Sequence, residues 1–270
     1  MSTQAAVIQM RSCSDVQRNL AWADLLLAQA AGRGAALAVL PENFACMTPL
    51  PEHLQRVAED FGAGPIQDFL VRMARKHKLW LVGGTLPLRT HDGRLSNTCL
   101  VFDDQGWLQR RYDKIHLFDV SIPDAESHCE SAHFLAGHEV IVINSPIGRL
   151  GLAICYDLRF PELFRQMLHQ GVEAVALPAA FTHATGKAHW EVLLRARAIE
   201  NQCFMLAAAQ EGEHFAGRRT FGHSQIIDPW GKILQQQSHG WGLAVAPIDR
   251  AQQQALREHF PVLRHRRLAC

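Results

Sequence analysis

The stretch that indicates most about the fold is residues 149–163, Arg149-Leu150-Gly151-Leu152-Ala153-Ile154-Cys155-Tyr156-Asp157-Leu158-Arg159-Phe160-Pro161-Glu162-Leu163. Its first six residues form a short apolar run, which is typical of a buried strand. Pro161 can open a helix, and Glu162 suits the positive N-terminal end of one. Cys155 is therefore predicted to lie where a strand runs into a helix. We expect that setting to lower the pKa of the Cys155 thiol and to favour the thiolate, which is the reactive form.

The bulk composition is that of an ordinary globular protein. The chain has 270 residues, of which 48% are hydrophobic and 20% charged, enough for one large domain or two small ones. The formal net charge is +1 and no long run of one sign appears, so the charge favours neither nucleic acid nor an acidic membrane surface as a partner. The most basic stretch, residues 264–267, is interpreted as a solvated tail or a subunit contact.

The termini and cysteines predict a cytoplasmic protein. Residues 1–10 lack the basic and long apolar regions of a signal peptide, and no stretch reaches the roughly 18 apolar residues of a membrane-spanning helix. The 7 cysteines are scattered, odd in number and without a C-x-x-C pair. This pattern argues against a disulfide framework or a zinc ribbon and favours a reducing compartment.

Strand–helix units alternate with hairpins along the chain, which predicts mixed sheets covered by helices in a layered α/β protein. Because no linker, repeat or low-complexity segment interrupts the pattern, we expect one domain over residues 1–270. The expected strands are residues 3–10, 35–40, 79–86, 97–102, 107–112, 139–143, 149–154, 172–177, 203–209, 224–227, 232–234 and 243–248. The expected helices are a segment capped by Ser14 and Gln17 that ends near Ala31, residues 64–78, a segment after Cys155 closed by Gly171, residues 188–202, and a short helix near the C-terminus.

Three polar groups follow the expected strands. Glu42 comes after residues 35–40, Lys114 after residues 107–112, and Cys155 after residues 149–154. Sheet-based sites are commonly built from groups at strand ends. A nucleophilic thiol needs a group that takes its proton and a group that holds the developing oxyanion, and a Glu and a Lys could supply these. Taken singly, each has a plainer interpretation as a solvated Glu, a solvated Lys or a structural Cys.

Taken together, these residues resemble the nitrilase, or carbon–nitrogen hydrolase, superfamily, whose Glu-Lys-Cys triad occurs in this chain order. Within it, the chain looks like the Nit-type amidases, a branch that includes omega-amidase and deaminated glutathione amidase, with the run at residues 207–210 more similar to the second. The resemblance covers effectively the whole chain. It rests on LPENF (40–44), YDKIHLFD (112–119), the run around Cys155, PAAFT (178–182), TGKAHW (185–190), RARAIEN (195–201), GHS (222–224) and DPWG (228–231).

The resemblance implies a role for each site residue. Cys155 would be the nucleophile, and Glu42 the general base that takes the thiol proton and later activates water. Lys114 would stabilise the tetrahedral oxyanion together with the backbone N–H of Tyr156. Glu130 matches a second glutamate of the family, which would position Lys114 and the leaving amine; without the resemblance it would be interpreted as a surface carboxylate. The implied product of the first step is a thioester, and neither a metal nor an organic cofactor is implied.

The expected substrate is a small-molecule amide, with water as the second reactant. Arg159 lies one helical turn past Cys155 if that segment is helical, and its guanidinium could bind a substrate carboxylate. It could equally form an ion pair with Asp157 or Glu162. Thr185, expected in the loop before a long helix, could donate a hydroxyl hydrogen bond. An amide of a 2-oxo dicarboxylic acid is the favoured class; nitriles, N-carbamoyl amino acids and simple aliphatic amides stay open.

Two other hypotheses compete with the amidase. A Cys-His thiol hydrolase could use His116, His183, His189 or His223, although no thiol-protease signature surrounds any of them. A binding or scaffold protein could keep the fold without the activity, although the intact Glu, Lys and Cys argue against it.

The resemblance also implies the architecture. The family forms a four-layer α-β-β-α sandwich, and its subunits pair to extend that sandwich. We therefore expect a homodimer or a higher homo-oligomer, with residues 259–267 as a candidate subunit contact.

Overall fold

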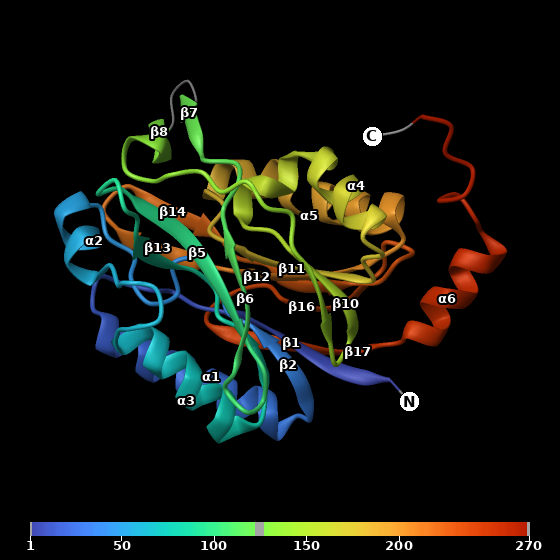
Figure 1. Cartoon of the computed structure of the whole chain (residues 1–270), viewed down its shortest axis with the longest axis horizontal. Helices are drawn as coiled ribbons and strands as arrows, with labels where there is room; N and C mark the ends of the chain where they lie inside the picture. The colour runs from blue at the N-terminus through green and yellow to red at the C-terminus, as the bar shows by residue number, and fades with distance from the viewer. Residues whose placement is uncertain (1, 122–126, 269–270) are drawn as a thin grey trace.

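The structure is a computed structural model that describes residues 2–121 and 127–268. Two β-sheets pack face to face in the middle, and helices cover the outer face of each (Figure 1). This arrangement confirms the expected α-β-β-α sandwich of a layered α/β protein.

The first sheet has seven strands, in the order β17-β1-β2-β3-β5-β4, with β6 paired to β5. The first strand lies parallel to the second and antiparallel to the last, so the first and last strands of the chain lie side by side. The strands are β1 (Thr3–Gln9), β2 (Ala35–Val39), β3 (Trp80–Val82), β4 (Leu86–Arg89), β5 (Leu95–Phe102), β6 (Leu108–Asp113) and β17 (Gly242–Ile248).

The second sheet has six strands, in the order β16-β15-β12-β11-β10-β9. Its three central strands run parallel, and the hairpins expected at residues 97–112, 139–154 and 224–234 are all antiparallel pairs. The strands are β9 (Val142–Ser145), β10 (Gly148–Leu152), β11 (Ala174–Ala179), β12 (Phe204–Ala209), β15 (Ser224–Ile227) and β16 (Ile233–Gln237).

The helices form the two outer layers. α1 (Val16–Gly32) and α3 (Pro65–His77) contact the first sheet and each other, and α5 (His183–Asn201) contacts the second sheet beside α4 (Pro161–His169) (Figure 1). The remaining elements are α2 (Pro51–Val57), α6 (Arg250–His259), the 3₁₀ helices η1 (Glu130–Ala132) and η2 (Cys155–Arg159), and the hairpins β7 (Asp119–Ser121) with β8 (Ser127–Cys129) and β13 (Glu211–Phe215) with β14 (Arg218–Phe221). No helix in the described ranges is long and apolar enough to cross a membrane.

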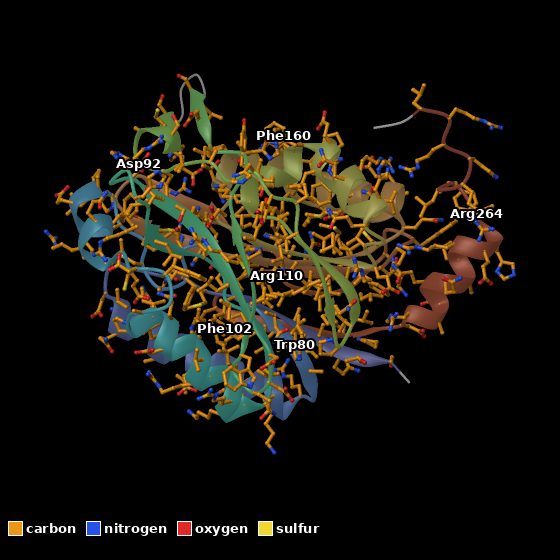
Figure 2. All side chains as sticks on the ribbon, viewed as in Figure 1. Trp80, Asp92, Phe102, Arg110, Phe160 and Arg264 are labelled. Carbon is orange, nitrogen blue, oxygen red and sulfur yellow. The ribbon has the colours of Figure 1, made fainter. Side chains whose placement is uncertain are left out.

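Strand β1 shows how the sequence fills two cores at once. Successive side chains of a strand point to opposite faces of the sheet. Ala5 and Val7 accordingly lie in the core between the two sheets, whereas Ala6 and Ile8 lie in the core under α1 and α3. All four are fully buried, which explains why residues 5–8 are all apolar and do not alternate with polar residues. Side chains crowd the space between the layers in Figure 2.

Four expected elements differ in the structure. The strand expected over residues 139–143 is β9 (Val142–Ser145), which shares only two residues with it. Helix α1 is capped by Asp15, whose side chain accepts from the Arg18 N–H, and not by Ser14. Helix α5 begins at His183 rather than at residue 188, because the Thr182 side chain caps it by accepting from the Thr185 N–H. The segment expected as one strand over residues 79–86 is divided into β3 and the start of β4.

Two glycines divide that strand. A Cβ on Gly83 would lie 2.7 Å from Leu70 Cδ1, and one on Gly84 would lie 2.3 Å from the carbonyl oxygen of Pro41. Gly84 also has a φ of +58°, which glycine adopts without steric cost. The chain therefore turns here and lets the segment that follows β2 pass very close to it. The sequence reasoning also missed α2 and the two small hairpins, which are short and partly exposed.

Candidate active site

The four polar residues expected in the site lie together. Lys114 Nζ is 2.9 Å from Glu42 Oε1 and 2.8 Å from Glu130 Oε2. The Glu42 carboxylate and the Lys114 ammonium both lie close enough to Cys155 for their charges to act on its thiol. They come from the ends of β2, β6 and β10 and from η1, so strand ends converge as the sequence predicted.

Glu42 is held by its own backbone. It is 4% exposed and lies in the turn after β2, where Asn43 has a φ of +55° and donates its N–H to Thr85 Oγ1 at 2.9 Å. The carbonyl oxygen of Glu42 accepts from Gln210 Nε2 at 3.0 Å. Because Gln210 lies directly after β12, both sheets fix the position of this carboxylate.

Lys114 and Glu130 form a closely contacting pair. The Lys114 N–H donates to Asn97 O at 3.0 Å, which continues the β5–β6 ladder, and its carbonyl accepts from the Gly137 N–H at 2.8 Å. The Glu130 side chain is 13% exposed, and its Oε2 also accepts from the Phe118 N–H at 2.7 Å. The structure thus places Glu130 inside the site and not on the surface.

Cys155 lies in a tight, strained turn. Its φ is +46°, which is uncommon for a residue with a side chain, and it opens the 3₁₀ helix η2 rather than α4 itself. The fully buried Asp157 fixes this turn by accepting from the Ile154 N–H at 2.8 Å, Tyr112 Oη at 2.7 Å and the His116 N–H at 3.0 Å. Since Tyr112 and His116 flank Lys114, one carboxylate sets the position of the thiol relative to the cation. Sequence reasoning did not identify this role of Asp157.

The expected low pKa of the Cys155 thiol is wrong. Burial and the neighbouring Glu42 carboxylate raise the pKa of Cys155 well above its usual range, and the opposing charge of Lys114 does not overcome them. The residue is 8% exposed, and the helix end that was expected to stabilise a thiolate is only a short 3₁₀ turn. The thiol is therefore protonated in the resting site and needs a base.

Lys114 is held as a cation. Burial by itself lowers the pKa of Lys114, but Glu130, Glu42 and Cys155 together outweigh it and raise that pKa well above its usual range. Two carboxylates, Glu42 and Glu130, contact this one ammonium, so a carboxylate there can accept a proton without creating a second buried positive charge.

Backbone donors lie next to the thiol. The first hydrogen bond within η2 runs from the Asp157 N–H to Ile154 O at 3.0 Å. The N–H groups of Cys155 and Tyr156 precede it and have no acceptor within the helix. The expected oxyanion donor, the Tyr156 N–H, is thus positioned beside Cys155.

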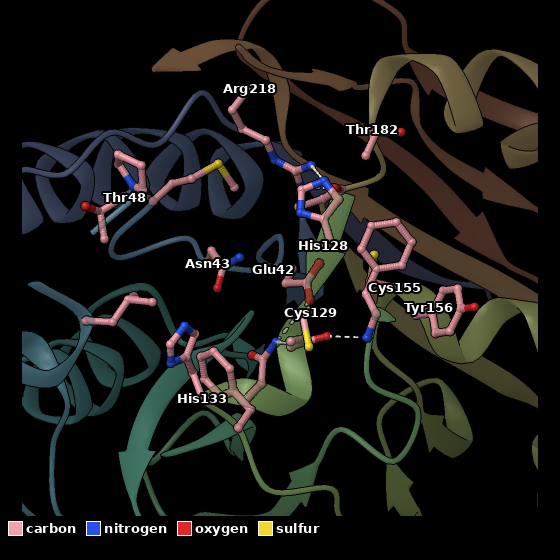
Figure 3. A pocket seen from close by; sticks show the side chains of 18 of the residues that line it. Glu42, Asn43, Thr48, His128, Cys129, His133, Cys155, Tyr156, Thr182 and Arg218 are labelled. Atoms are coloured by element: carbon pink, nitrogen blue, oxygen red, sulfur yellow. Dashed lines mark hydrogen bonds between the residues drawn. The ribbon is translucent and has the colours of Figure 1, made fainter. Parts of the chain in front are cut away.

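The site opens into a cavity of about 630 Å³ (Figure 3). Glu42, Lys114, Glu130, Cys155 and Tyr156 line it at the sheet edge, and residues from α2, β8 and the β13–β14 hairpin complete its walls. The wall residues include Asn97, His128 and Arg218, none of which was identified from the sequence; Arg218 Nη1 lies 3.2 Å from His128 Nε2.

Arg159 and Thr185 also line the cavity. The Arg159 guanidinium lies over the rings of Tyr156 and Phe181, at 5.8 and 5.2 Å from their centroids, and its Nη1 is 3.2 Å from His189 Nδ1. These contacts replace the ion pair with Asp157 or Glu162 that was the alternative for Arg159. The position expected for Thr185 is wrong, because this residue lies in the first turn of α5, where its hydroxyl is 2.8 Å from Thr182 Oγ1.

The four histidines of the Cys-His alternative point elsewhere. His116 Nδ1 contacts Asp157 at 2.7 Å, and His189 contacts Arg159. His183 and His223 pack on Phe221. Within residues 2–121 and 127–268, none of the four lines the cavity, and no cluster of three or more His, Cys, Asp or Glu is arranged to share a metal ion.

Comparison with known proteins decides the family. A family model described as carbon-nitrogen hydrolase matches residues 4–258. The chain belongs to the carbon–nitrogen hydrolase family. It is therefore a hydrolase that acts on amides, as the sequence resemblance implied.

Individual members of the carbon–nitrogen hydrolase family resemble the chain over nearly its whole length. A deaminated glutathione amidase of Yersinia enterocolitica is 42% identical over 98% of this chain and 93% of its own. The crystal structure of the C. elegans NitFhit protein superposes with a TM-score of 0.91 at 39% identity, covering 99% of this chain and 66% of that one. A mutant amidase from Nesterenkonia sp. AN1, in which acrylamide has added to the active-site cysteine, superposes with a TM-score of 0.79 at 26% identity, over 96% of this chain and 98% of that one.

Proposed function

We propose that this carbon–nitrogen hydrolase cleaves its amide through a thioester on Cys155. As Sγ attacks the carbonyl carbon, Glu42 takes the thiol proton and the carbonyl electron pair moves to the oxygen. Lys114 and the Tyr156 N–H stabilise that oxyanion. When the C–N bond breaks, Glu42 returns the proton to the leaving amine. Glu42 then deprotonates a water that attacks the thioester, which releases the acid and restores the thiol.

This proposal rests on the contacts within one buried cluster, formed by Glu42, Lys114, Glu130 and Cys155. The thiol lies beside the carboxylate that must take its proton, and that carboxylate is 2.9 Å from the only cation in direct contact with it in the described chain. Lys114 has three N–H groups. One donates to Glu42 and one can be shared by the two oxygens of Glu130, which leaves the third for the oxyanion.

We propose deaminated glutathione, or a related monoamide of a 2-oxo dicarboxylic acid, as the substrate. The name of the Yersinia relative supports this, as does a cavity of about 630 Å³, which is roomier than a four- or five-carbon amide requires. Arg159 supplies a guanidinium preorganised on two rings for a substrate carboxylate. The alternatives are an omega-amidase acting on 2-oxoglutaramate or 2-oxosuccinamate, and a binding protein without activity.

The first prediction concerns the nucleophile. Replacing Cys155→Ala should reduce release of ammonia or amine to background, because no thioester can form, and Glu42→Gln should reduce it by at least about 10³-fold. Cys129→Ser is the matched control, since this exposed thiol also lines the cavity. Activity of Cys155→Ala near the wild-type level would contradict the mechanism. Loss with Cys155→Ala but not with Glu42→Gln would favour the Cys-His hydrolase, and an inactive wild type across all amides would favour the binding protein.

The second prediction concerns the substrate. In a panel of deaminated glutathione, 2-oxoglutaramate, 2-oxosuccinamate and propionamide, the first should give the highest kcat/KM. Arg159→Met should lower kcat/KM by about 10²-fold for the carboxylates, because a charged hydrogen-bonded pair is lost, and should leave propionamide within threefold. A higher kcat/KM for 2-oxoglutaramate than for deaminated glutathione would instead indicate the omega-amidase.

We also propose a cytoplasmic, one-domain protein that forms a homodimer or a higher homo-oligomer. The six described free cysteines suit a reducing compartment. The C-terminal segment supports self-association. Helix α6 and the residues after it extend beyond the sandwich, and Arg264 lies on that extension (Figures 1 and 2). The side chains of Phe260 and Leu268 are apolar and yet 49% and 85% exposed. A monomeric mass in light scattering would contradict the dimer.

A further inference from the structure

Asn97, on β5, contacts both carboxylates of the site. It is 3% exposed, and its Nδ2 lies 3.0 Å from Glu42 Oε1 and 3.1 Å from Glu130 Oε1. An amide nitrogen carries two N–H donors, so one can serve each carboxylate. The opposite orientation of the amide would place its oxygen against two carboxylate oxygens, so the contacts themselves fix which end faces the site.

The two carboxylates differ in how fully they are occupied. Glu130 accepts from Asn97 and Lys114 on Oε1 and from Lys114 and the Phe118 N–H on Oε2. A carboxylate offers about four lone-pair directions, and these four contacts use them. On Glu42, by contrast, the described donors Asn97 and Lys114 both end on Oε1. Within the described residues no hydrogen-bond donor reaches Glu42 Oε2, so that oxygen is the one available to accept the proton of the neighbouring Cys155 thiol.

We propose that Asn97 is a positioning residue that makes Glu42, and not Glu130, the base and directs the Cys155 proton to Oε2. By donating to Oε1 it turns the plane of the Glu42 carboxylate toward the thiol. By donating to Glu130 it fills the last acceptor direction there. In the attack, the S–C bond forms as the proton moves from Sγ to Oε2, and Asn97 and Lys114 keep their bonds to Oε1. This inference rests on the proposed thioester mechanism.

Two substitutions at Asn97 keep nearly the size or shape of its side chain, and the same strand offers a matched control. Asn97→Leu keeps the size of the side chain and removes both donors, and Asn97→Asp keeps its shape and turns the donor into an acceptor. Ser96→Ala is the control, because Ser96 is 2% exposed on the same strand but points to the other face, toward Thr98 and Leu88 O. If Asn97 only filled space, Asn97→Leu would behave like Ser96→Ala.

We expect Asn97→Leu and Asn97→Asp to lower kcat by about 10²-fold, with KM within threefold, in the range measured when one preorganised donor is removed from an active site. The acid limb of kcat/KM against pH should move to higher pH in Asn97→Leu, because the anionic base loses a hydrogen-bond donor. The charged or titratable groups beside Glu42 are Lys114 and Cys155, and Glu130 contacts the same Lys114. Ser96→Ala should move neither quantity.

Thermal melting monitors folding of each variant. If Asn97→Leu does not fold, Asn97→Ser, whose hydroxyl can reach only one carboxylate, is expected to lower kcat about tenfold. A kcat within threefold of wild type in a folded Asn97→Leu, with an unchanged pH profile, would overturn the inference. The thioester mechanism is tested separately from the role of Asn97. If that mechanism were wrong, Cys155→Ala would keep its activity, whatever the Asn97 variants do.

Discussion

Cys155 carries a thiol whose ionisation depends on two neighbours of opposite charge. Burial and Glu42 raise its pKa, and Lys114 lowers it. A thiol that stays protonated does not react indiscriminately, since the thiolate is the nucleophile. Reactivity then arises only when a substrate carbonyl is in place to receive the sulfur while Glu42 takes the proton.

The third prediction tests this balance at the residue. In Glu42→Gln the anion that raises the thiol pKa is gone while Lys114 remains, so the pH midpoint for alkylation of Cys155 by iodoacetamide should fall. Amide hydrolysis should be lost in the same variant. The measurement is the alkylation rate against pH, followed by mass spectrometry of the labelled cysteine, with Cys129→Ser to remove the exposed cavity thiol. A midpoint that rises or does not move would show that Glu42 does not control the thiol.

At the scale of elements, the turn after β2 depends on its close approach to the β3–β4 connection. Gly84 sits against the carbonyl of Pro41, one residue before the base, and Asn43 bonds Thr85. The position of the Glu42 carboxylate therefore depends on a glycine in a neighbouring strand connection and not only on its own segment.

The fourth prediction is that Gly84→Ala lowers both stability and activity. The new Cβ would lie 2.3 Å from the carbonyl oxygen of Pro41 and must displace the Pro41–Glu42 segment, and the positive φ of residue 84 adds strain. We therefore expect the free energy of unfolding to fall by about 2–4 kcal/mol and kcat to fall at least tenfold. Gly93→Ala is the matched control, because its φ is +82° but nothing lies within 4 Å of the added carbon. It should cost about 1 kcal/mol and leave kcat unchanged. Urea unfolding and steady-state kinetics measure both; equal effects of the two variants would refute the role of Gly84.

At the scale of the whole molecule, a half-buried histidine links the loop after β1 to the β13–β14 hairpin. His214 on β13 contacts Ser12 O and Thr220 Oγ1, each at 2.7 Å. Burial, with Arg218 and Arg11 nearby, lowers the pKa of His214 to about 4, against a weaker opposing hydrogen bond to Ser12. The folded protein thus holds this ring neutral where the unfolded chain would protonate it.

The fifth prediction follows from the sign of that shift. Below the ordinary value of 6.5 the unfolded chain binds a proton that the folded protein does not bind until about pH 4, so stability falls as pH drops through that window and is unaffected above it. His214 should contribute a loss of about 2 kcal/mol between pH 7.5 and pH 5. Urea unfolding at both values should show a smaller loss in His214→Gln, since all other titrating groups are shared. An equal loss in the two proteins would contradict the assignment.

Local sequence patterns were enough for much of the layered fold and for the catalytic candidates. Apolar runs, turn residues and the order Glu42, Lys114, Cys155 are local features. The strands before Glu42 and Lys114 lie in the first sheet and the strand before Cys155 lies in the second, so the packing of the two sheets brings the three residues together. Short or exposed elements such as α2 and the β13–β14 hairpin lack such a pattern. The start of α5 was misplaced because its cap, Thr182, is recognisable only through its bond to Thr185.

The amino-acid sequence by itself therefore predicts a layered α/β protein, because that depends on regular spacing, and its motifs indicate the family. The resemblance to that family in turn implies the four layers and the candidate reactive residues. The tertiary structure alone decides how they react. The protonated state of the Cys155 thiol, the two bonds of Asn97 and the close approach at Gly84 arise between segments far apart in the chain. Burial and charge act through space, and local sequence carries no record of which distant side chain will lie 3 Å away.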